Sequence, residues 1–279
     1  MPRALVIRAQ GTNCDKELCR AFEIAGAEPS LRHLDALISD PSQIDEFDLI
    51  GFPGGFSYGD DIASGRIMAA LVRERLYAPL RDAVLRGCPI IGICNGFQVL
   101  VQVGLLPGPL DGVWPTDRAP KQTCALTENA GARFIDRWVE IAPVPASRCV
   151  WTAGLDSVHA DHVDRPHGMR LPIAHGEGRF VTDSPATLER LENDGLVALR
   201  YATDVNGSEN AIAGICDASG RVFGLMPHPE RFLEWNRHPY FTRLDSRLRS
   251  QETLGRRIFQ NAVAAASKAS RPSGRPQMV

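Results

Sequence analysis

The chain has 279 residues with a formal net charge of −2 at pH 7, and 44% of its residues are hydrophobic. This composition is typical of a globular protein with one or two domains. The balanced charge argues against a nucleic-acid or membrane-surface binder, and no apolar run is long enough to span a bilayer. The apolar stretch at residues 4–7 is too short for a secretion signal. We therefore expect a cytoplasmic protein with no membrane or nucleic-acid partner.

Short apolar runs alternate with longer helical patterns in the first hundred residues. Strands are predicted at residues 4–8, 48–52 and 89–93, and helices at 13–25, 62–85 (with a break at Pro79) and 97–103. Asn13 is the expected cap of the first helix. This order predicts a doubly wound α/β fold, with a mostly parallel sheet flanked by helices and a flavodoxin-like core.

The second half has a more antiparallel character. Strands are predicted at residues 138–142, 196–201, 211–216 and 222–226, and helices at 187–193 and 252–266. We expect one domain over residues 1–270. The last nine residues, 271–279, contain two Pro, one Gly and two Arg and are expected to form a disordered tail.

Seven cysteines are scattered along the chain, and none forms a C-x-x-C pair. The sequence therefore shows neither a zinc ribbon nor a thioredoxin-type motif. Reduced thiols in the cytoplasm are the simplest interpretation of the odd count. A reactive thiol among them must be identified from its neighbours.

One cysteine has the neighbours of a nucleophile. The segment from Gly92 to Gly96 reads G-x-C-x-G, which is the spacing of a nucleophile elbow with Cys94 in place of serine. Small residues on both sides relieve crowding at a sharp strand-to-helix turn. The turn places the sulfur at a helix N-terminus, which favours the thiolate, and Asn95 can supply an oxyanion N–H. A buried structural cysteine in a tight turn is the alternative.

A thiolate needs an acid/base partner, and His228 is the strongest candidate among seven histidines. Pro229 keeps His228 in an extended conformation, so that Glu230, two residues on, can lie beside the imidazole and orient it. This predicts Cys94 as nucleophile, His228 as acid/base and Glu230 as the orienting carboxylate. Taken alone, the H-P-E segment is more often an ordinary loop.

Gly54 and Gly55 follow a predicted strand and lie at the carboxyl edge of the sheet, where ligands bind in open α/β folds. Backbone N–H groups without a neighbouring Cβ are good oxyanion donors. A flexible glycine turn is the alternative interpretation.

Two other features carry less weight. The residues His159, Asp161, His162, Asp164 and His167 crowd together, but their spacing matches no known zinc motif, so we predict no metal site. No G-x-x-x-x-G-K-[ST] sequence is present, which argues against a P-loop nucleotide site.

Together these segments resemble the class I (triad) glutamine amidotransferases. The resemblance spans residues 6–231, and within the family it is close to the glutaminase subunits of phosphoribosylformylglycinamidine synthase, an enzyme of purine synthesis. It rests on six segments in order, which are G-T-N-C-D (11–15), G-G-F-S-Y-G-D (54–60), C-N-G-F-Q (94–98), G-L-L-P-G (104–108), P-I-A-H-G-E-G-R (172–179) and M-P-H-P-E-R (226–231).

The resemblance implies a role for each matching residue. Cys94 would form a γ-glutamyl thioester, with His228 and Glu230 completing the triad, and the backbone of Gly55 and Asn95 would form the oxyanion hole. Four further residues would lie near the bound L-glutamine, namely Gly54, Gln98, His175 and Glu177.

The resemblance also implies partners. Ammonia released from glutamine would pass to an ATP-dependent synthetase subunit, and a small bridging subunit would join the complex. No cofactor is expected in this chain, whereas ATP and Mg²⁺ are expected on the synthetase partner.

The chain departs from the common family pattern after Asp60, where Asp61-Ile62-Ala63-Ser64 replaces an aromatic residue and a Leu-Arg pair. The stretch 143–170 and the chain after Arg231 are longer than in short family members, and we expect both near the partner surface.

Three alternatives stay open. They are a glutaminase that serves a different synthetase, a catalytically silent amidotransferase-like subunit, and a papain-like cysteine protease. The protease fits least well, because its C-G-[SA]-C-[WY] signature is missing.

Overall fold

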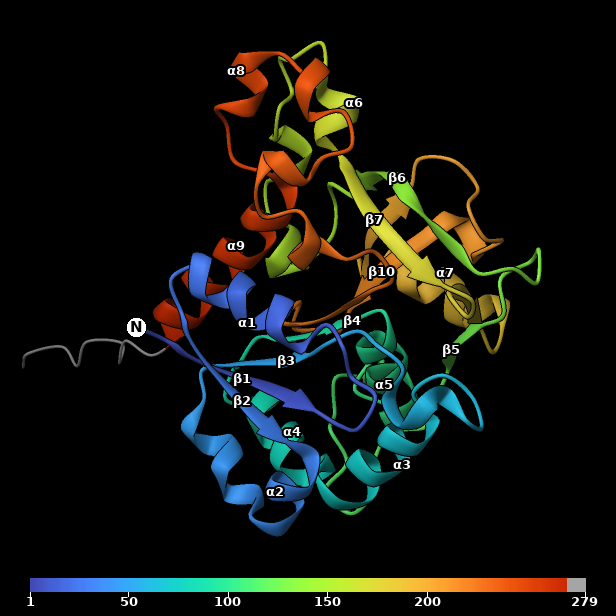
Figure 1. Cartoon of the computed structure of the whole chain (residues 1–279). Helices are drawn as coiled ribbons and strands as arrows, with labels where there is room; N and C mark the ends of the chain where they lie inside the picture. The colour runs from blue at the N-terminus through green and yellow to red at the C-terminus, as the bar shows by residue number, and fades with distance from the viewer. Residues whose placement is uncertain (270–279) are drawn as a thin grey trace, which may run out of the picture.

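The computed structural model describes residues 1–269, and a nine-stranded sheet forms its centre (Figure 1). The strand order is β2-β1-β3-β4-β11-β10-β9-β6-β7. The first five strands of this order are parallel, namely β2 (Glu28–His33), β1 (Arg3–Arg8), β3 (Leu49–Phe52), β4 (Ile90–Ile93) and β11 (Val222–Leu225). Their arrangement is that of the flavodoxin-like doubly wound fold, as the sequence predicts.

The remaining four strands extend the sheet in an antiparallel manner. They are β10 (Ile212–Cys216), β9 (Val197–Tyr201), β6 (Ile135–Pro143) and β7 (Arg170–His175). A separate antiparallel pair is formed by β5 (Cys124–Thr127) and β8 (Arg179–Thr182), followed by helix α7 (Pro185–Asn193). The predicted antiparallel extension is confirmed.

Helices cover both faces of the parallel strands (Figure 1). On one side lie α1 (Asp15–Ile24) and α9 (Leu254–Ala269), which meet through an edge-to-face contact of Phe22 and Phe259 with ring centroids 5.5 Å apart. The other side carries α2 (Leu34–Ser39), α3 (Arg66–Arg75), α4 (Tyr77–Leu85) and α5 (Asn95–Val103). Apolar side chains of the sheet are therefore buried on both faces.

Some details of the predicted elements are wrong, and the strands β5, β7 and β8 were not predicted. The helix expected over 62–85 breaks at Leu76 and not at Pro79, because Pro79 occupies the first turn of α4, where its missing N–H costs no hydrogen bond. The strand β2 was not predicted, since it is an edge strand without an apolar alternation. Cys14, not Asn13, stands at the start of α1, and it makes no side-chain cap bond.

The two long stretches of the chain pack against each other in the lobe at the top of Figure 1. The two stretches contain η3 (Val150–Thr152), η4 (Leu155–Ser157), α6 (Arg165–Gly168), η7 (Trp235–Arg237), η8 (Phe241–Arg243) and α8 (Ser246–Arg249). His238 Nε2 lies 3.0 Å from the carbonyl oxygen of His167, and the backbone N–H of Asp245 donates to Asp164 Oδ2 at 3.3 Å. Hydrogen bonds thus join the two stretches to each other.

Among the described residues, no helix is long and apolar enough to cross a bilayer. The expected tail at residues 271–279 lies outside them.

Candidate active site

Cys94 lies at the turn between β4 and α5, where the backbone is strained. Its φ and ψ angles are 52° and −108°, in a region that side-chain-bearing residues rarely adopt. The turn is tight because α5 packs directly on β3, so a Cβ placed on Gly96 would lie 2.0 Å from the carbonyl oxygen of Phe52. The backbone N–H of Cys94 donates to Leu225 at the end of β11 at 2.8 Å. The predicted strand–turn–helix setting of Cys94 is therefore present.

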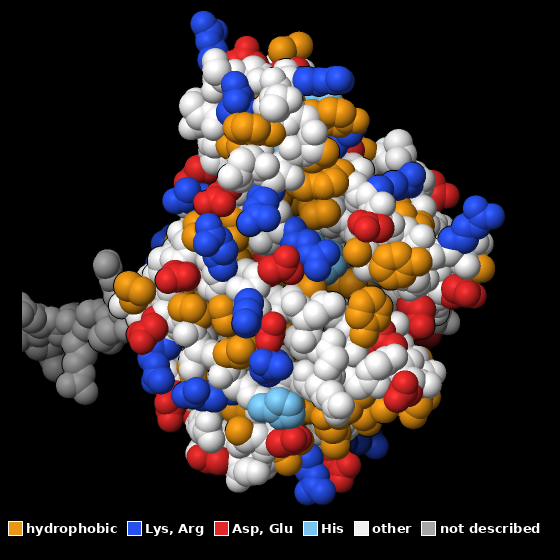
Figure 2. All heavy atoms as spheres, viewed as in Figure 1, with side chains coloured by type: hydrophobic (Ala, Val, Ile, Leu, Met, Phe, Trp, Pro, Cys, Tyr) orange, Lys and Arg blue, Asp and Glu red, His pale blue; other side chains and the backbone are white. Residues whose placement is uncertain are grey.

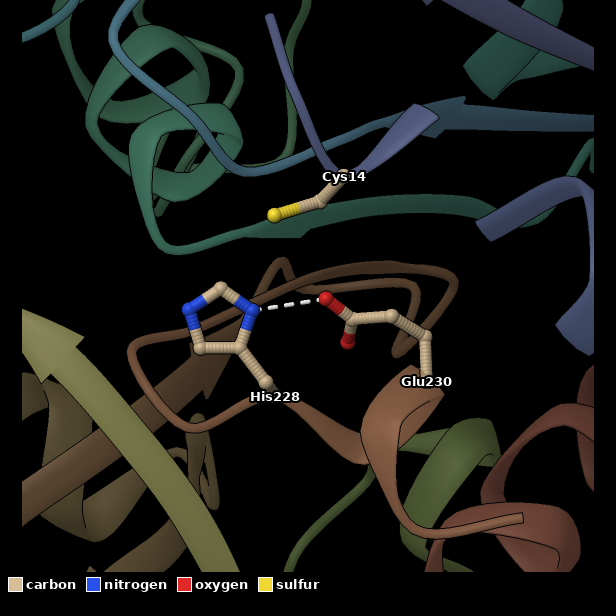
Figure 3. Close-up of side chains that lie close together, drawn as sticks. All are labelled: Cys14, His228 and Glu230. Carbon is tan, nitrogen blue, oxygen red and sulfur yellow. Dashed lines mark hydrogen bonds and ion pairs between the residues drawn. The ribbon is translucent and has the colours of Figure 1, made fainter. Parts of the chain in front are cut away.

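His228 follows β11 and lies next to Glu230. Its Nδ1 is 2.6 Å from Glu230 Oε1, and the His228 and Glu230 side chains are 2% and 0% exposed (Figure 3). The backbone N–H of His228 donates to the carbonyl of Pro172 in β7 at 2.8 Å, which fixes the segment against the antiparallel strands. The residues Pro229–Arg231 form a short 3₁₀ turn, η6, and not the expected extended chain, but the contact forms nonetheless.

The surroundings of His228 favour its charged form. Burial alone would lower the pKa of His228, but the Glu230 carboxylate, and then the nearby Cys14 and Cys94 thiols, raise it well above the ordinary value. An imidazolium next to a thiol stabilises the thiolate.

Gly55 and Asn95 face this region from two neighbouring strand ends. Gly55 has a φ of 139°, and a Cβ there would lie 2.7 Å from the backbone nitrogen of Asn13, so only glycine fits. The turn is held by bonds from Phe56 N–H to Gly11 O and from Cys14 N–H to Gly54 O, and the Gly55 N–H has no backbone partner among residues 1–269. Asn95 opens α5, where the first N–H groups have no partner within the helix.

Gln98 and Glu177 join the elbow to the loop after β7. The side-chain oxygen of Gln98 accepts a bond from Asn95 Nδ2 at 3.1 Å, and its Nε2 donates to the carbonyl of Glu177. The Glu177 carboxylate accepts from the N–H of Ser64 at 3.3 Å. Both polar ends of Gln98 are thus engaged, and contacts of Gln98, Glu177 and Gly54 with glutamine stay predictions.

His175 is buried at the end of β7. Its Nδ1 lies 3.1 Å from Asn129 Oδ1, while Nε2 is buried without a partner among the described residues. Burial, with a smaller contribution from the nearby charge on His228, lowers the pKa of His175 to about 4. His175 is therefore neutral at pH 7, and its contact with glutamine also stays a prediction.

Two residues near the site were not singled out from the sequence. Cys14 lies close to His228 and Glu230. Its Sγ, one ring nitrogen of His228 and one carboxylate oxygen of Glu230 all lie within 4.8 Å of one another (Figure 3). The G-T-N-C-D segment was the available signal for it. Tyr201 on β9 has a buried hydroxyl without a partner among the described residues, and burial and the nearby Cys94 raise its pKa. No sequence motif marks Tyr201.

The histidines of the 159–167 stretch have other neighbours. His159 Nδ1 lies 2.8 Å from Gln251 Oε1, and His162 Nε2 lies 3.8 Å from Asp245. In the part of the chain that the structure describes, these side chains form no group of three possible metal ligands.

The arrangement as a whole suits attack on a carbonyl carbon. A thiol lies beside an imidazole that is paired with a carboxylate, and backbone N–H groups from two strand ends can bind the oxygen that becomes negative. These are the parts needed for acyl transfer through a thioester.

Comparisons with known proteins identify the same family. Residues 1–264 match the model of the CobB/CobQ-like glutamine amidotransferase domain. The PurQ subunit of phosphoribosylformylglycinamidine synthase from Dehalococcoides mccartyi is 41% identical, over 94% of this chain and 96% of that protein. The PurQ subunit from Thermotoga maritima is 39% identical, over 84% of this chain and 89% of that protein.

Solved structures agree. A chain in the structure of PurLQS from Thermotoga maritima has a TM-score of 0.66 and 34% identity, with 94% of this chain and 98% of that chain covered. The resemblance drawn from the six sequence segments is thereby confirmed. The chain belongs to the glutamine amidotransferases, and among them to the family of PurQ subunits of phosphoribosylformylglycinamidine synthase.

Proposed function

We propose that the chain is the glutaminase subunit of a phosphoribosylformylglycinamidine synthase. It hydrolyses L-glutamine to glutamate and ammonia, and it delivers the ammonia to a synthetase partner. The observation that carries this proposal is the buried His228–Glu230 pair, which lies next to Cys94 across Gly54, in a chain of the PurQ family. That pairing supplies the chemistry that amide hydrolysis requires.

The reaction follows from the geometry in two steps. The Cys94 thiolate attacks the side-chain amide carbon of glutamine, and the C–N bond breaks as the His228 imidazolium gives its proton to the departing ammonia. A water molecule then attacks the thioester while His228 takes up its proton, and glutamate and the free thiolate are released. Glu230 holds the imidazole in the orientation that both steps need.

The negative charge that develops on the amide oxygen needs donors that are already in place. The N–H groups of Gly55 and Asn95 supply them. Removal of one such donor typically costs about 10²- to 10³-fold in rate.

The partner would be an ATP-dependent synthetase on a separate chain, with ATP and Mg²⁺ bound there and a small bridging subunit in the complex. The segment after Gly55 offers apolar side chains for this contact, since Phe56 and Ile62 are 47% and 71% exposed. Acidic and basic side chains alternate over the face seen in Figure 2, which suits a protein partner. All seven cysteines are free thiols, as suits the cytoplasm.

Mass spectrometry after treatment with an electrophilic glutamine analogue tests the nucleophile. We expect one adduct, on Cys94, which glutamine protects. Cys19 is the internal control, because burial and nearby carboxylates raise its pKa to about 11. Labelling spread evenly over the seven cysteines contradicts a selectively activated thiolate.

Purification of the chain from its native cell tests the partner. We expect the phosphoribosylformylglycinamidine synthetase subunit to accompany it and to stimulate its glutaminase activity. If a different synthetase accompanies the chain, the proposed pathway is wrong but the glutaminase activity still stands. Full glutaminase activity of the isolated chain would contradict its dependence on a partner.

A further inference from the structure

The Cys14 thiol has no part in the reaction above, yet it lies within the catalytic centre. Its side chain is 1% exposed, and Sγ donates to Asn13 Oδ1 at 3.2 Å. The guanidinium of Arg231 donates to the same sulfur at 3.1 Å and pairs with Glu17 of α1 at 3.2 Å. Cys14 therefore connects the start of α1 with the segment that carries the catalytic histidine.

The backbone of Cys14 also holds the oxyanion turn. Its N–H donates to the carbonyl of Gly54 at 3.2 Å, and this carbonyl belongs to the peptide group whose N–H is that of Gly55. A Cβ placed on Gly54 would lie 2.8 Å from His228 Cε1, 3.3 Å from Cys14 Sγ and 3.4 Å from Cys94 Cβ. The base His228, the nucleophile Cys94 and the thiol of Cys14 thus all lie next to Gly54.

Two other roles for this thiol fit less well. A second nucleophile would need a thiolate, but burial raises the pKa of Cys14 more than His228 lowers it. A ligand for a cation would place the metal next to the positive charge of Arg231, 3.1 Å from the sulfur. A neutral thiol whose sulfur accepts a hydrogen bond from Arg231 agrees with both observations.

We propose that Cys14 is a positioning residue that holds His228 and the Gly54–Gly55 turn in the geometry that catalysis requires. The inference rests on the proposed glutaminase function and deepens it. The sulfur accepts a hydrogen bond from Arg231 and lies within 4.8 Å of a ring nitrogen of His228, while the backbone N–H of Cys14 fixes the oxyanion peptide. Without the Cys14 thiol, His228 loses one of the groups that stabilise its charged form.

A pH effect follows, and it depends on all groups that face His228. They are Glu230 and Arg231 of η6, Cys94 at the elbow, His175 of β7 and Cys14 at the start of α1. Removal of Cys14 leaves the other four in place, so the imidazolium loses its proton at a lower pH but remains paired with Glu230.

The test is made in the complex with the synthetase and compares Cys14→Ala, Cys14→Ser and the control Cys19→Ala, which changes a thiol five residues further on, within α1. For Cys14→Ala we expect kcat to fall about tenfold with KM nearly unchanged, and the alkaline limb of the kcat/KM profile to move about one pH unit lower. Cys14→Ser keeps a polar acceptor and should recover part of both effects, and Cys19→Ala should resemble the wild type.

A second readout does not require glutamine turnover. The rate of Cys94 alkylation by iodoacetamide against pH reports the thiolate, and Cys14→Ala should lower this rate at pH 7. A wild type that hydrolyses no glutamine in the complex would refute the proposed function, while the alkylation profile would still test Cys14.

An unchanged alkaline limb and unchanged alkylation in Cys14→Ala would overturn the positioning role, even if the variant were less stable to heat. If Cys14→Ala does not fold, Cys14→Ser becomes the test. Wild-type pH profiles of Cys14→Ser in both assays would then overturn the positioning role of Cys14.

Discussion

The two sides of the catalytic centre are held in place by different forces. The nucleophile side, from β4 through Cys94 to α5, is fixed by backbone packing, with Gly96 pressed against the carbonyl of Phe52. The base side, from β11 through His228 to η6, is fixed by polar side-chain contacts with Glu230 and by the neighbouring thiols. Substitutions that add volume should therefore damage the first side, and substitutions that remove a polar group should damage the second.

The largest effect is expected on the base side. Glu230→Gln replaces the buried carboxylate with a neutral amide, so the imidazolium loses its charge partner and its fixed tautomer. We expect kcat for glutamine hydrolysis to fall about 10³-fold with little change in stability. Glu234→Gln is the matched control, since that carboxylate is 44% exposed and pairs with Arg20 at the surface. Equal effects of both variants would contradict the special role of Glu230.

On the nucleophile side the expected damage is to folding. Gly96→Ala would put a Cβ 2.0 Å from a backbone oxygen that cannot move away without shifting β3. We expect the free energy of unfolding, from urea denaturation, to fall by about 3 kcal/mol, the upper end of the usual cost of overpacking. Gly131→Ala, where nothing lies within 4 Å of the new Cβ, should be nearly neutral. A stable and active Gly96→Ala variant would show that packing does not fix the elbow.

This contrast also explains what the sequence could predict. The nucleophile side is local, because an apolar strand, a G-x-C-x-G turn and a helix follow one another within residues 89–103. The pairing of His228 with Glu230 was predictable for the same reason, since only Pro229 separates them in the sequence. Cys14 and Tyr201 are far from Cys94 and His228 in the sequence. They come close to the site only because of the order of the strands in the sheet, which no local sequence pattern predicts. The polar edge strand β2 was missed because pairing with β1, and not an apolar pattern, makes it a strand.

The antiparallel half contributes a pH-dependent stability through His175. Burial lowers the pKa of His175 from 6.5 to about 4. Between pH 6.5 and pH 4 the unfolded chain takes up a proton on His175 that the folded chain does not. The contribution of His175 to stability is therefore fully present above pH 6.5 and is lost as the pH falls towards 4.

The loss of stability expected from His175 is at most about 3 kcal/mol, at about 1.4 kcal/mol per pKa unit. The measurement is the difference in unfolding free energy between pH 7 and pH 4.5, which should be smaller in His175→Asn than in the wild type. His33→Asn changes a histidine whose side chain is 43% exposed and should leave the difference as it is. An identical acid sensitivity of the wild type and His175→Asn would contradict a neutral buried imidazole.

The most direct test of the account replaces the nucleophile in the assembled complex. In Cys94→Ala, synthesis with glutamine should be abolished, because no thioester can form, while synthesis with added ammonium salts should continue at the wild-type rate. Survival of glutamine-dependent synthesis in this variant would contradict the assignment of Cys94. Loss of ammonium-dependent synthesis from a complex that still assembles would contradict the separation of glutaminase and synthetase between two chains.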